Sequence, residues 1–361
     1  MITITCSQPG YAIKLFQVLN TRGLNLSPAD LIKSHLYGKL EDEIKRRQFI
    51  STWQEIEIIS KQMEESITDL LTYYEYHLLG QNPRGSLYEE LTKQFNGQDP
   101  NKNIYEFKEF VDFFNEITRL ESKLIFSFWY LPNQVFWKAI LTTAKRKGFS
   151  EFEGLCKELR KMYYSYWIAG YSISRIKQLS FKIIGWVKEN RKLIDIISEI
   201  EKKMKDDNII PRVMDSLRND VYGESWLRPL LVLVEYAQTD DAKISYIELD
   251  SKLHVDHILP LGWKSVPEWN KTWTEKQAEK WLNKIGNLTL LSKRKNVAQR
   301  NDPPFKKKQM YEKGYGGKTA FIISQKVIDA LGNSGWTEKD VQERQEWIIK
   351  EIESIFEVKL N

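Results

Sequence analysis

The sequence has little cysteine and no long apolar run. Two cysteines occur among its 361 residues, at Cys6 and Cys156, which excludes a zinc site built mainly from cysteine and fits a reducing cytoplasm. No apolar stretch approaches the roughly 20 residues that a membrane helix needs. Residues 1–6 also lack the basic start and apolar core of a signal peptide. We therefore expect a cytoplasmic chain with no membrane partner.

The charge is unevenly spread along the chain. Hydrophobic residues make up 42% and charged residues 29%, as in a soluble globular protein long enough for two or three domains. The net charge is only +5, yet residues 251–318 hold 15 Lys and Arg against six Asp and Glu. By itself such a cluster favours a solvated, lysine-rich surface. Beside catalytic residues it favours an anionic polymer as partner.

Most of the chain from residue 40 to 238 is patterned as helix. Apolar residues recur there at three- and four-residue steps, for example at Ile67, Leu70 and Tyr74. We therefore predict a mainly α protein with a multi-helix domain over residues 40–243. Aromatic residues at this spacing usually fill a core, although stacking on bases is the open alternative for Tyr73, Tyr74, Tyr76, Tyr163, Tyr164, Tyr166 and Trp167.

Local signals predict several other elements. A helix is expected to begin after Ser27, which can act as its N-cap, with Pro28 in the first helical position and Asp30 three residues after the cap. Patterns of the same local kind predict strands at residues 2–5 and 244–249, a helix over residues 275–282 and a last helix from Thr337.

A set of residues suited to phosphodiester hydrolysis lies between residues 254 and 301. It comprises the pair Asp256-His257, then Asn287, and finally Asn296 nine residues later. The reaction needs a base to activate water and a cation to neutralise charge on the phosphate. An imidazole with a pKa of about 6.5 is largely neutral in a cytoplasm, so His257 is our candidate base, oriented by a carbonyl of Asn287.

Asp256 and Asn296 are the candidate ligands for Mg²⁺ or Mn²⁺. Their oxygens are hard ligands, and two protein ligands leave room for waters and a phosphate. Neighbouring residues on a strand point to opposite faces, so Asp256 and His257 serve one site only at a strand end or bend. The breaker at residues 260–262 favours such an end.

The order and spacing of these residues resemble the HNH, or ββα-metal, nucleases. In that family the same nine-residue step separates the middle Asn from the last ligand, and here Asn296 stands in place of the commoner final His. The resemblance implies a small ββα-metal module. It also implies that Asp256 and Asn296 bind the metal, that His257 is the general base and that Asn287 orients it.

The C-terminal part resembles, more specifically, the nuclease domain of the GmrSD-type, modification-dependent (type IV) restriction endonucleases. The matching stretches are His257–Pro260, Gly286–Leu291, Asn296–Lys308 and the closing helix Trp336–Ile349. The resemblance implies a DNA endonuclease or nickase that acts on foreign or modified DNA in phage defence.

Residues 16–27 resemble the end of the same family's N-terminal, ParB-like, nucleotide-hydrolysing domain. That domain carries an Asp-Gly-Gln-Gln-Arg motif, which this sequence lacks. We therefore expect no nucleotide cofactor in this chain and assign Asn20, Arg22 and Gly23 to capping and turning ahead of the helix at Ser27. A fragment, a degenerate gene and a short relative all stay open, as does a partner that supplies the missing domain.

Basic and polar residues around the set are candidates for contact with DNA. Arg300, four residues after Asn296, is our candidate for stabilising the transition state. His254 and Asn301 are accessory candidates, although a histidine on a strand surface explains His254 equally well. The candidates for phosphate contact are Lys293, Arg294, Lys295, Lys306, Lys307 and Lys308.

These observations predict a mainly α fold in which residues 1–39 are a remnant of the ParB-like domain, 40–243 the helical domain, and 244–361 an HNH module with closing helices. The predicted function is metal-dependent cleavage of DNA. A catalytically inactive DNA-binding or assembly subunit is the main alternative, and RNA cleavage by a toxin-like effector is the third.

Overall fold

The computed structural model describes residues 26–240, 244–292, 301–312 and 321–360. Within them the chain divides into two compact units, which are described separately below. Several sequence predictions lie outside the described residues: the strand at 2–5, the assignments of Asn20, Arg22 and Gly23, and the site residues Lys293, Arg294, Lys295, Asn296 and Arg300.

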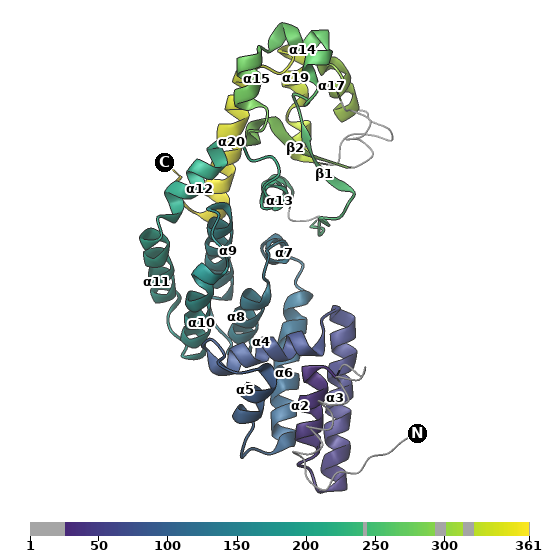
Figure 1. Ribbon diagram of the computed structural model, residues 1–361, viewed down its shortest axis with the longest axis vertical. Helices are drawn as coiled ribbons and strands as arrows, with labels where there is room; N and C mark the ends of the chain where they lie inside the picture. The colour runs from purple at the N-terminus through teal and green to yellow at the C-terminus, as the bar shows by residue number, and fades with distance from the viewer. Residues whose placement is uncertain (1–25, 241–243, 293–300, 313–320, 361) are drawn as a thin grey trace. The chain divides into compact units, whose positions relative to one another are not determined.

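Unit 1 covers residues 26–120, 133–153 and 174–196 of the described chain and is helical (Figure 1). Its helices arise from the three- and four-residue spacing of apolar side chains. They are α2 (Pro28–Tyr37), α3 (Glu43–Met63), α4 (Ile67–Leu79), α5 (Leu87–Gln94), α6 (Pro100–Thr118), α8 (Val135–Arg146) and α10 (Ser174–Lys188).

The core of unit 1 is aromatic. Tyr74 of α4 is 1% exposed, and its ring centroid lies 5.3 Å from those of Phe107 and Phe110 on α6. The start of α2 follows the predicted cap, because the Ser27 hydroxyl accepts from the backbone N–H of Asp30 at 3.2 Å. Among the helical aromatics with a stacking alternative, the core interpretation is confirmed for Tyr73, Tyr74, Tyr163, Tyr164 and Tyr166, which are all buried.

Unit 2 covers residues 121–132, 154–173 and 197–360 of the described chain. The division between the units passes near the starts of α9 and α11, so it does not follow the boundaries predicted at residues 39/40 and 243/244. The elements of unit 2 are α7 (Lys123–Trp129), α9 (Phe152–Ile168), α11 (Leu193–Asp206), α12 (Ile209–Arg218), α13 (Leu227–Gln238), β1 (Leu253–His257), η2 (Trp263–Ser265), α14 (Pro267–Thr272), α15 (Glu275–Trp281), η3 (Ile285–Asn287), β2 (Leu288–Ser292), α17 (Pro304–Glu312), α18 (Ile322–Gln325), α19 (Ile328–Asn333) and α20 (Glu338–Phe356).

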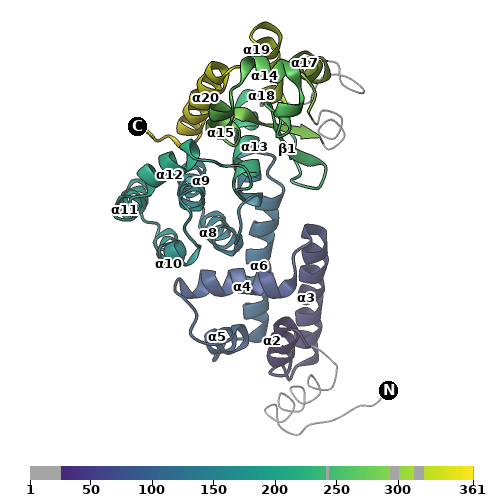
Figure 2. The same ribbon diagram turned by 45° about the horizontal axis from the view of Figure 1, so that its top comes forward.

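Strands β1 and β2, both labelled in Figure 1, form a two-stranded antiparallel sheet, and Figure 2 shows β1 from a second direction. The register pairs Leu253 with Ser292 at one end and His257 with Leu288 at the other. Helices α13 and α18 contact β2. The described chain is thus mainly helical, as predicted, with a small sheet in unit 2.

Residues 244–249 do not form the predicted strand. Side chains hold this segment instead, since the Tyr236 hydroxyl accepts from the N–H of Ile247 at 2.9 Å. The Arg228 guanidinium donates to Leu249 O at 2.9 Å. Strand propensity is largely a fit to neighbouring strands, and a run whose backbone partners are side chains has no ladder to join.

Buried tryptophans form the core beneath the sheet in unit 2, namely Trp263, Trp269, Trp273, Trp281 and Trp336. A buried indole N–H needs a hydrogen-bond acceptor. Trp273 donates to Trp336 O at 2.7 Å, and Trp336 donates to Asn287 Oδ1 at 3.0 Å. The core therefore reaches the predicted site residues through hydrogen bonds as well as through apolar packing.

Two predicted helix starts in unit 2 are confirmed. Helix α15 begins at Glu275 after a capping box on Thr274, and α20 begins at Glu338 after a capping box on Thr337. Among the helices in the described part of the chain, none combines the length and apolar character required to cross a bilayer.

Candidate active site

Strand β1 ends on Asp256 and His257. Asp256 pairs with Thr289, and His257 pairs with Leu288, the first residue of β2. The two residues are only 6% and 5% exposed. His257 is the last residue of β1, so the pair lies at the strand end, and its two side chains have different partners in unit 2.

Helix α17 supplies the partners of Asp256. The Lys307 ammonium donates to Asp256 Oδ2 at 3.2 Å, and the Tyr311 hydroxyl donates to the same oxygen at 3.0 Å. Lys307 and Tyr311 are four residues apart and therefore share one face of the helix. The Lys307 ammonium also donates to the backbone carbonyl of His257. Lys307 thus fixes the carboxylate of Asp256 relative to the backbone of His257.

The prediction that Lys307 contacts DNA phosphate does not hold in this structure. Its side chain is 0% exposed, whereas a phosphate contact needs a solvent-facing amine. Burial lowers the pKa of the Lys307 ammonium, and the carboxylate of Asp256 raises it. Burial also raises the pKa of Tyr311 well above its usual value, so this hydroxyl stays a neutral donor. The role of Lys307 is therefore internal to the protein.

The ring of His257 contacts Asn283 and Tyr222. Its Nε2 lies 3.1 Å from Asn283 Oδ1. The centroids of the Tyr222 and His257 rings are 4.2 Å apart, with the ring planes inclined at 55°. Tyr222 is 49% exposed, so its ring lies between the buried imidazole and solvent.

Burial favours the neutral form of the His257 imidazole. Desolvation lowers the pKa of His257 below its ordinary value of 6.5, against the hydrogen bond with Asn283 and the charge of Asp256, which both raise it, while Lys307 lowers it further. The net shift is downward. A neutral imidazole keeps one nitrogen lone pair that can accept a proton.

Asn287 does not contact the ring of His257, which differs from the prediction. Its Nδ2 donates to Leu259 O at 3.1 Å and to Leu282 O at 2.8 Å. Its Oδ1 accepts from Leu259 N at 2.8 Å and from Trp336 Nε1 at 3.0 Å. All hydrogen-bonding groups of this amide have partners within the fold, so Asn287 holds the backbone that follows His257. The imidazole of His257 is hydrogen-bonded by Asn283 instead.

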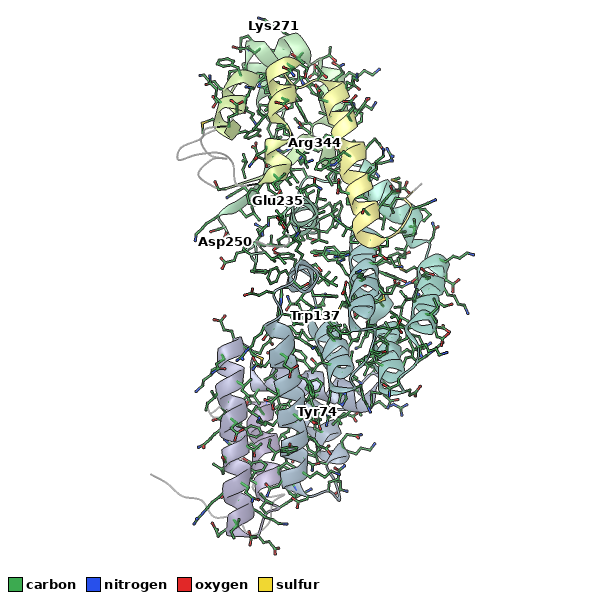
Figure 3. All side chains as sticks on the ribbon, turned by 180° about the vertical axis from the view of Figure 1, so that it is seen from behind. Tyr74, Trp137, Glu235, Asp250, Lys271 and Arg344 are labelled. Carbon is green, nitrogen blue, oxygen red and sulfur yellow. The ribbon has the colours of Figure 1, made fainter. Side chains whose placement is uncertain are left out.

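Helix α20 supports the turn that carries Asn287. Arg344, labelled in Figure 3, is 7% exposed and donates to Gly286 O at 3.0 Å and to Leu288 O at 2.7 Å. A Cβ atom at Gly286 would lie 2.2 Å from the backbone oxygen of Val341. Glycine therefore allows η3 and α20 to approach closely enough for the Arg344 contacts.

The other described candidates lie at or near the surface. Lys306 is exposed, and Lys308 is partly buried and forms a 2.8 Å ion pair with a glutamate of the same helix. Asn301 is exposed, and its Oδ1 accepts from the N–H of Gly262 at 3.1 Å. His254 is partly buried, with Nε2 at 3.1 Å from a nearby backbone carbonyl.

Sequence analysis missed three residues of this site. Spacing could have indicated Asn283, which precedes Asn287 by four residues, and Tyr311, which follows Lys307 by four. No sequence signal marks Tyr222, because it belongs to the loop between α12 and α13 and meets the site only in the folded chain.

The carboxylate of Asp256 fits a hard cation. Helix α17 engages Oδ2, whereas Oδ1 accepts no hydrogen bond from the described residues. A carboxylate with one oxygen oriented by the protein can offer its second oxygen to Mg²⁺. No group of three or more His, Cys, Asp or Glu gathers for metal binding in the described chain, so a metal here would need Asn296, water or phosphate as further ligands.

The fold and the site define a mainly helical protein with a two-stranded module that presents an Asp-His pair. Residues 205–351 match the family described as GmrSD restriction endonucleases, C-terminal domain. The match includes both strands, α17 and most of α20. It confirms the resemblance noted for the C-terminal part of the sequence. A search of curated proteins gives no significant match.

Proposed function

We propose that the chain is a metal-dependent endonuclease that hydrolyses phosphodiester bonds in DNA through an active site of the HNH type. The observation that carries the proposal is the buried His257 directly beside Asp256 at the end of β1, in a segment that matches a restriction endonuclease family. Restriction makes foreign or modified DNA the expected substrate, and phage defence the expected role.

His257 acts as the general base in this proposal. Its free nitrogen accepts a proton from water while the water oxygen bonds to phosphorus and the bond to the leaving oxygen breaks. Solvent then supplies a proton to the leaving oxygen. Asp256 and Asn296 would hold Mg²⁺ or Mn²⁺, which supplies neutralisation of the charge that develops on the phosphate.

The residues around the pair serve orientation and DNA binding. Lys307 and Tyr311 hold Oδ2 of Asp256 from α17, so Oδ1 keeps one direction. Lys306 is exposed and contacts the DNA backbone, together with the basic residues at 293–295. Arg300 stabilises the transition state.

Nicking of supercoiled plasmid tests the proposal. We expect wild type to nick in Mg²⁺ or Mn²⁺, EDTA to stop the reaction, and added metal to restore it. His257→Ala should lower the rate by about 100-fold or more, since a positioned general base contributes about 10²–10⁴-fold. His35→Ala, which removes a partly buried histidine of α2, is the matched control and should leave the rate unchanged.

Three outcomes would redirect the assignment. Equal rates for wild type and His257→Ala would remove His257 as the base. Salt-dependent DNA binding without cleavage in any divalent metal would favour an inactive DNA-binding or assembly subunit. Faster digestion of RNA than of duplex DNA, measured side by side, would change the substrate class to RNA.

A further inference from the structure

The loop between α12 and α13 carries Tyr222 to the imidazole. Val221 is fully buried, and its N–H donates to Asn283 O at 2.9 Å. One residue earlier, Asp220 forms an ion pair with Lys284 at 3.2 Å. These two contacts with adjacent residues fix the loop against the segment that follows α15, so the position of Tyr222 is set by the fold.

Asn283 connects this loop to His257. Its backbone carbonyl binds Val221, and its side-chain Oδ1 lies 3.1 Å from Nε2 of His257. A carbonyl oxygen only accepts, so Nε2 of the neutral imidazole carries the proton. Nδ1 has no hydrogen-bond partner among the described residues, so none of them uses its lone pair.

We propose that Asn283 and Tyr222 are positioning residues for His257. Asn283 selects the tautomer with the proton on Nε2, Tyr222 restrains the plane of the ring, and Nδ1 is the nitrogen that accepts the proton from water. The catalytic part of this inference rests on the proposed nuclease function. The tautomer part does not, because it concerns the resting protein.

Nuclear magnetic resonance of the full chain with ¹⁵N-labelled histidine reads the tautomer directly. The chain has four histidines, so the spectrum is simple, and single His→Ala variants assign it. His77 serves as an internal reference for the opposite tautomer. Its Nε2 lies 2.9 Å from Nη1 of Arg146, which only donates, so its proton sits on Nδ1, facing Thr143 at 2.9 Å.

At a pH where both imidazoles are neutral, wild type should show the His257 proton on Nε2 and the His77 proton on Nδ1. Asn283→Leu removes the acceptor and should give a mixture of tautomers at His257, with His77 unchanged. Asn283→Asp keeps an acceptor at the same place and should retain the wild-type tautomer. Asn333→Leu, at an exposed position ending α19, is the matched control.

Steady-state cleavage then separates positioning from folding and DNA binding. Asn283→Leu and Tyr222→Ala should lower kcat by about 10- to 100-fold with little change in KM, the usual cost of losing a group that orients a catalytic residue. Tyr222→Phe keeps the ring and should recover most of kcat. Tyr105→Ala removes an exposed tyrosine of α6 and should have no effect.

The two readouts fail independently. A His257 proton on Nδ1 in wild type, or an unchanged tautomer in Asn283→Leu, would overturn the role of Asn283. Equal kcat for Tyr222→Ala and wild type would overturn the role of Tyr222. If wild type does not cleave, the nuclease proposal fails, while a tautomer change in Asn283→Leu would still establish Asn283 as the residue that holds the imidazole.

Discussion

At the residue scale, the ion pair between Lys307 and Asp256 is buried within the candidate site. The ammonium is 0% and the carboxylate side chain 8% exposed, so both charges have lost most of their hydration. Such a pair is not a strong net source of stability, but the loss of one partner leaves a buried charge without compensation. The additional bonds to Tyr311 and to the carbonyl of His257 make the position specific.

Lys307→Met should therefore lower the free energy of unfolding by about 3 kcal/mol or more. In an Asp256→Asn background the same substitution should cost much less, because no carboxylate remains to be neutralised. Urea unfolding followed by circular dichroism measures both losses. Equal losses in the two backgrounds would contradict the coupling.

Two buried groups on α4 should give the stability of unit 1 opposite dependences on pH. Burial, with Arg146 and nearby lysines, lowers the pKa of His77 from 6.5 to about 3. Below pH 6.5 His77 is protonated in the unfolded chain but stays neutral in the folded chain. The free energy of unfolding therefore falls as the pH falls from 6.5 towards 3. Burial raises the pKa of Glu75 from 4.5 to about 7, so that its contribution rises as the pH falls from 7 to 4.5.

Single substitutions separate these two groups. In Glu75→Gln only the His77 effect remains. Its unfolding free energy should therefore fall by about 2 kcal/mol between pH 7 and pH 5, because one pKa unit represents about 1.36 kcal/mol. His77→Gln should gain stability over the same interval. Thermal unfolding at the two pH values provides the comparison, and parallel slopes in the two variants would be the contrary result.

At the element scale, the contact between η3 and α20 supports the site. Arg344 of α20 binds the carbonyls around Asn287, and Asn287 in turn holds the backbone after His257. Gly286 is the residue whose missing side chain permits this approach. The geometry of the candidate site therefore depends on a helix that contributes none of its proposed catalytic residues.

Gly286→Ala should destabilise the chain and lower nuclease activity together. The new Cβ would lie 2.2 Å from the backbone oxygen of Val341. The backbone shift that relieves this clash should lower the free energy of unfolding by about 1–3 kcal/mol or more. Gly185→Ala is the matched control. It lies within α10 with no neighbour near its added Cβ, and alanine should be neutral or stabilising there by about 0.5–1 kcal/mol. Urea unfolding of both variants tests the difference.

At the scale of the whole molecule, the uneven charge predicts how the chain meets DNA. The net charge is +5, but the excess of Lys and Arg is concentrated in residues 251–318. Association should therefore weaken steeply with salt, because each phosphate neutralised releases counterions. Burial decides which lysines take part, and the neighbours Lys306 and Lys307 differ completely in this respect.

Lys306→Gln should reduce the slope of log affinity against log salt by about 0.9, which corresponds to the loss of one phosphate contact. Lys350→Gln, at an exposed position of α20, should leave the slope unchanged. Fluorescence anisotropy with a labelled duplex over a salt series measures both. A slope in Lys306→Gln that equals that of wild type would remove Lys306 from the DNA-binding surface.

The sequence predicted those parts of the fold that depend on near neighbours. The helix starts after Ser27, Thr274 and Thr337 were predictable because a capping box joins residues three apart. The strand predicted at 244–249 was wrong because strand formation requires a partner that local sequence does not specify. Apolar periodicity predicted the helices but not that they divide between two units.

For the site, the sequence by itself determined the Asp256-His257 pair, its place in a basic region and the likeness of residues 205–351 to the GmrSD family. Only the tertiary structure decided what surrounds the pair. It placed Asn283 rather than Asn287 at the imidazole, brought Tyr222 from a distant loop and buried Lys307 against Asp256. Adjacent residues are fixed by covalent bonds, whereas the partners of a buried polar group depend on how elements far apart in the sequence pack together.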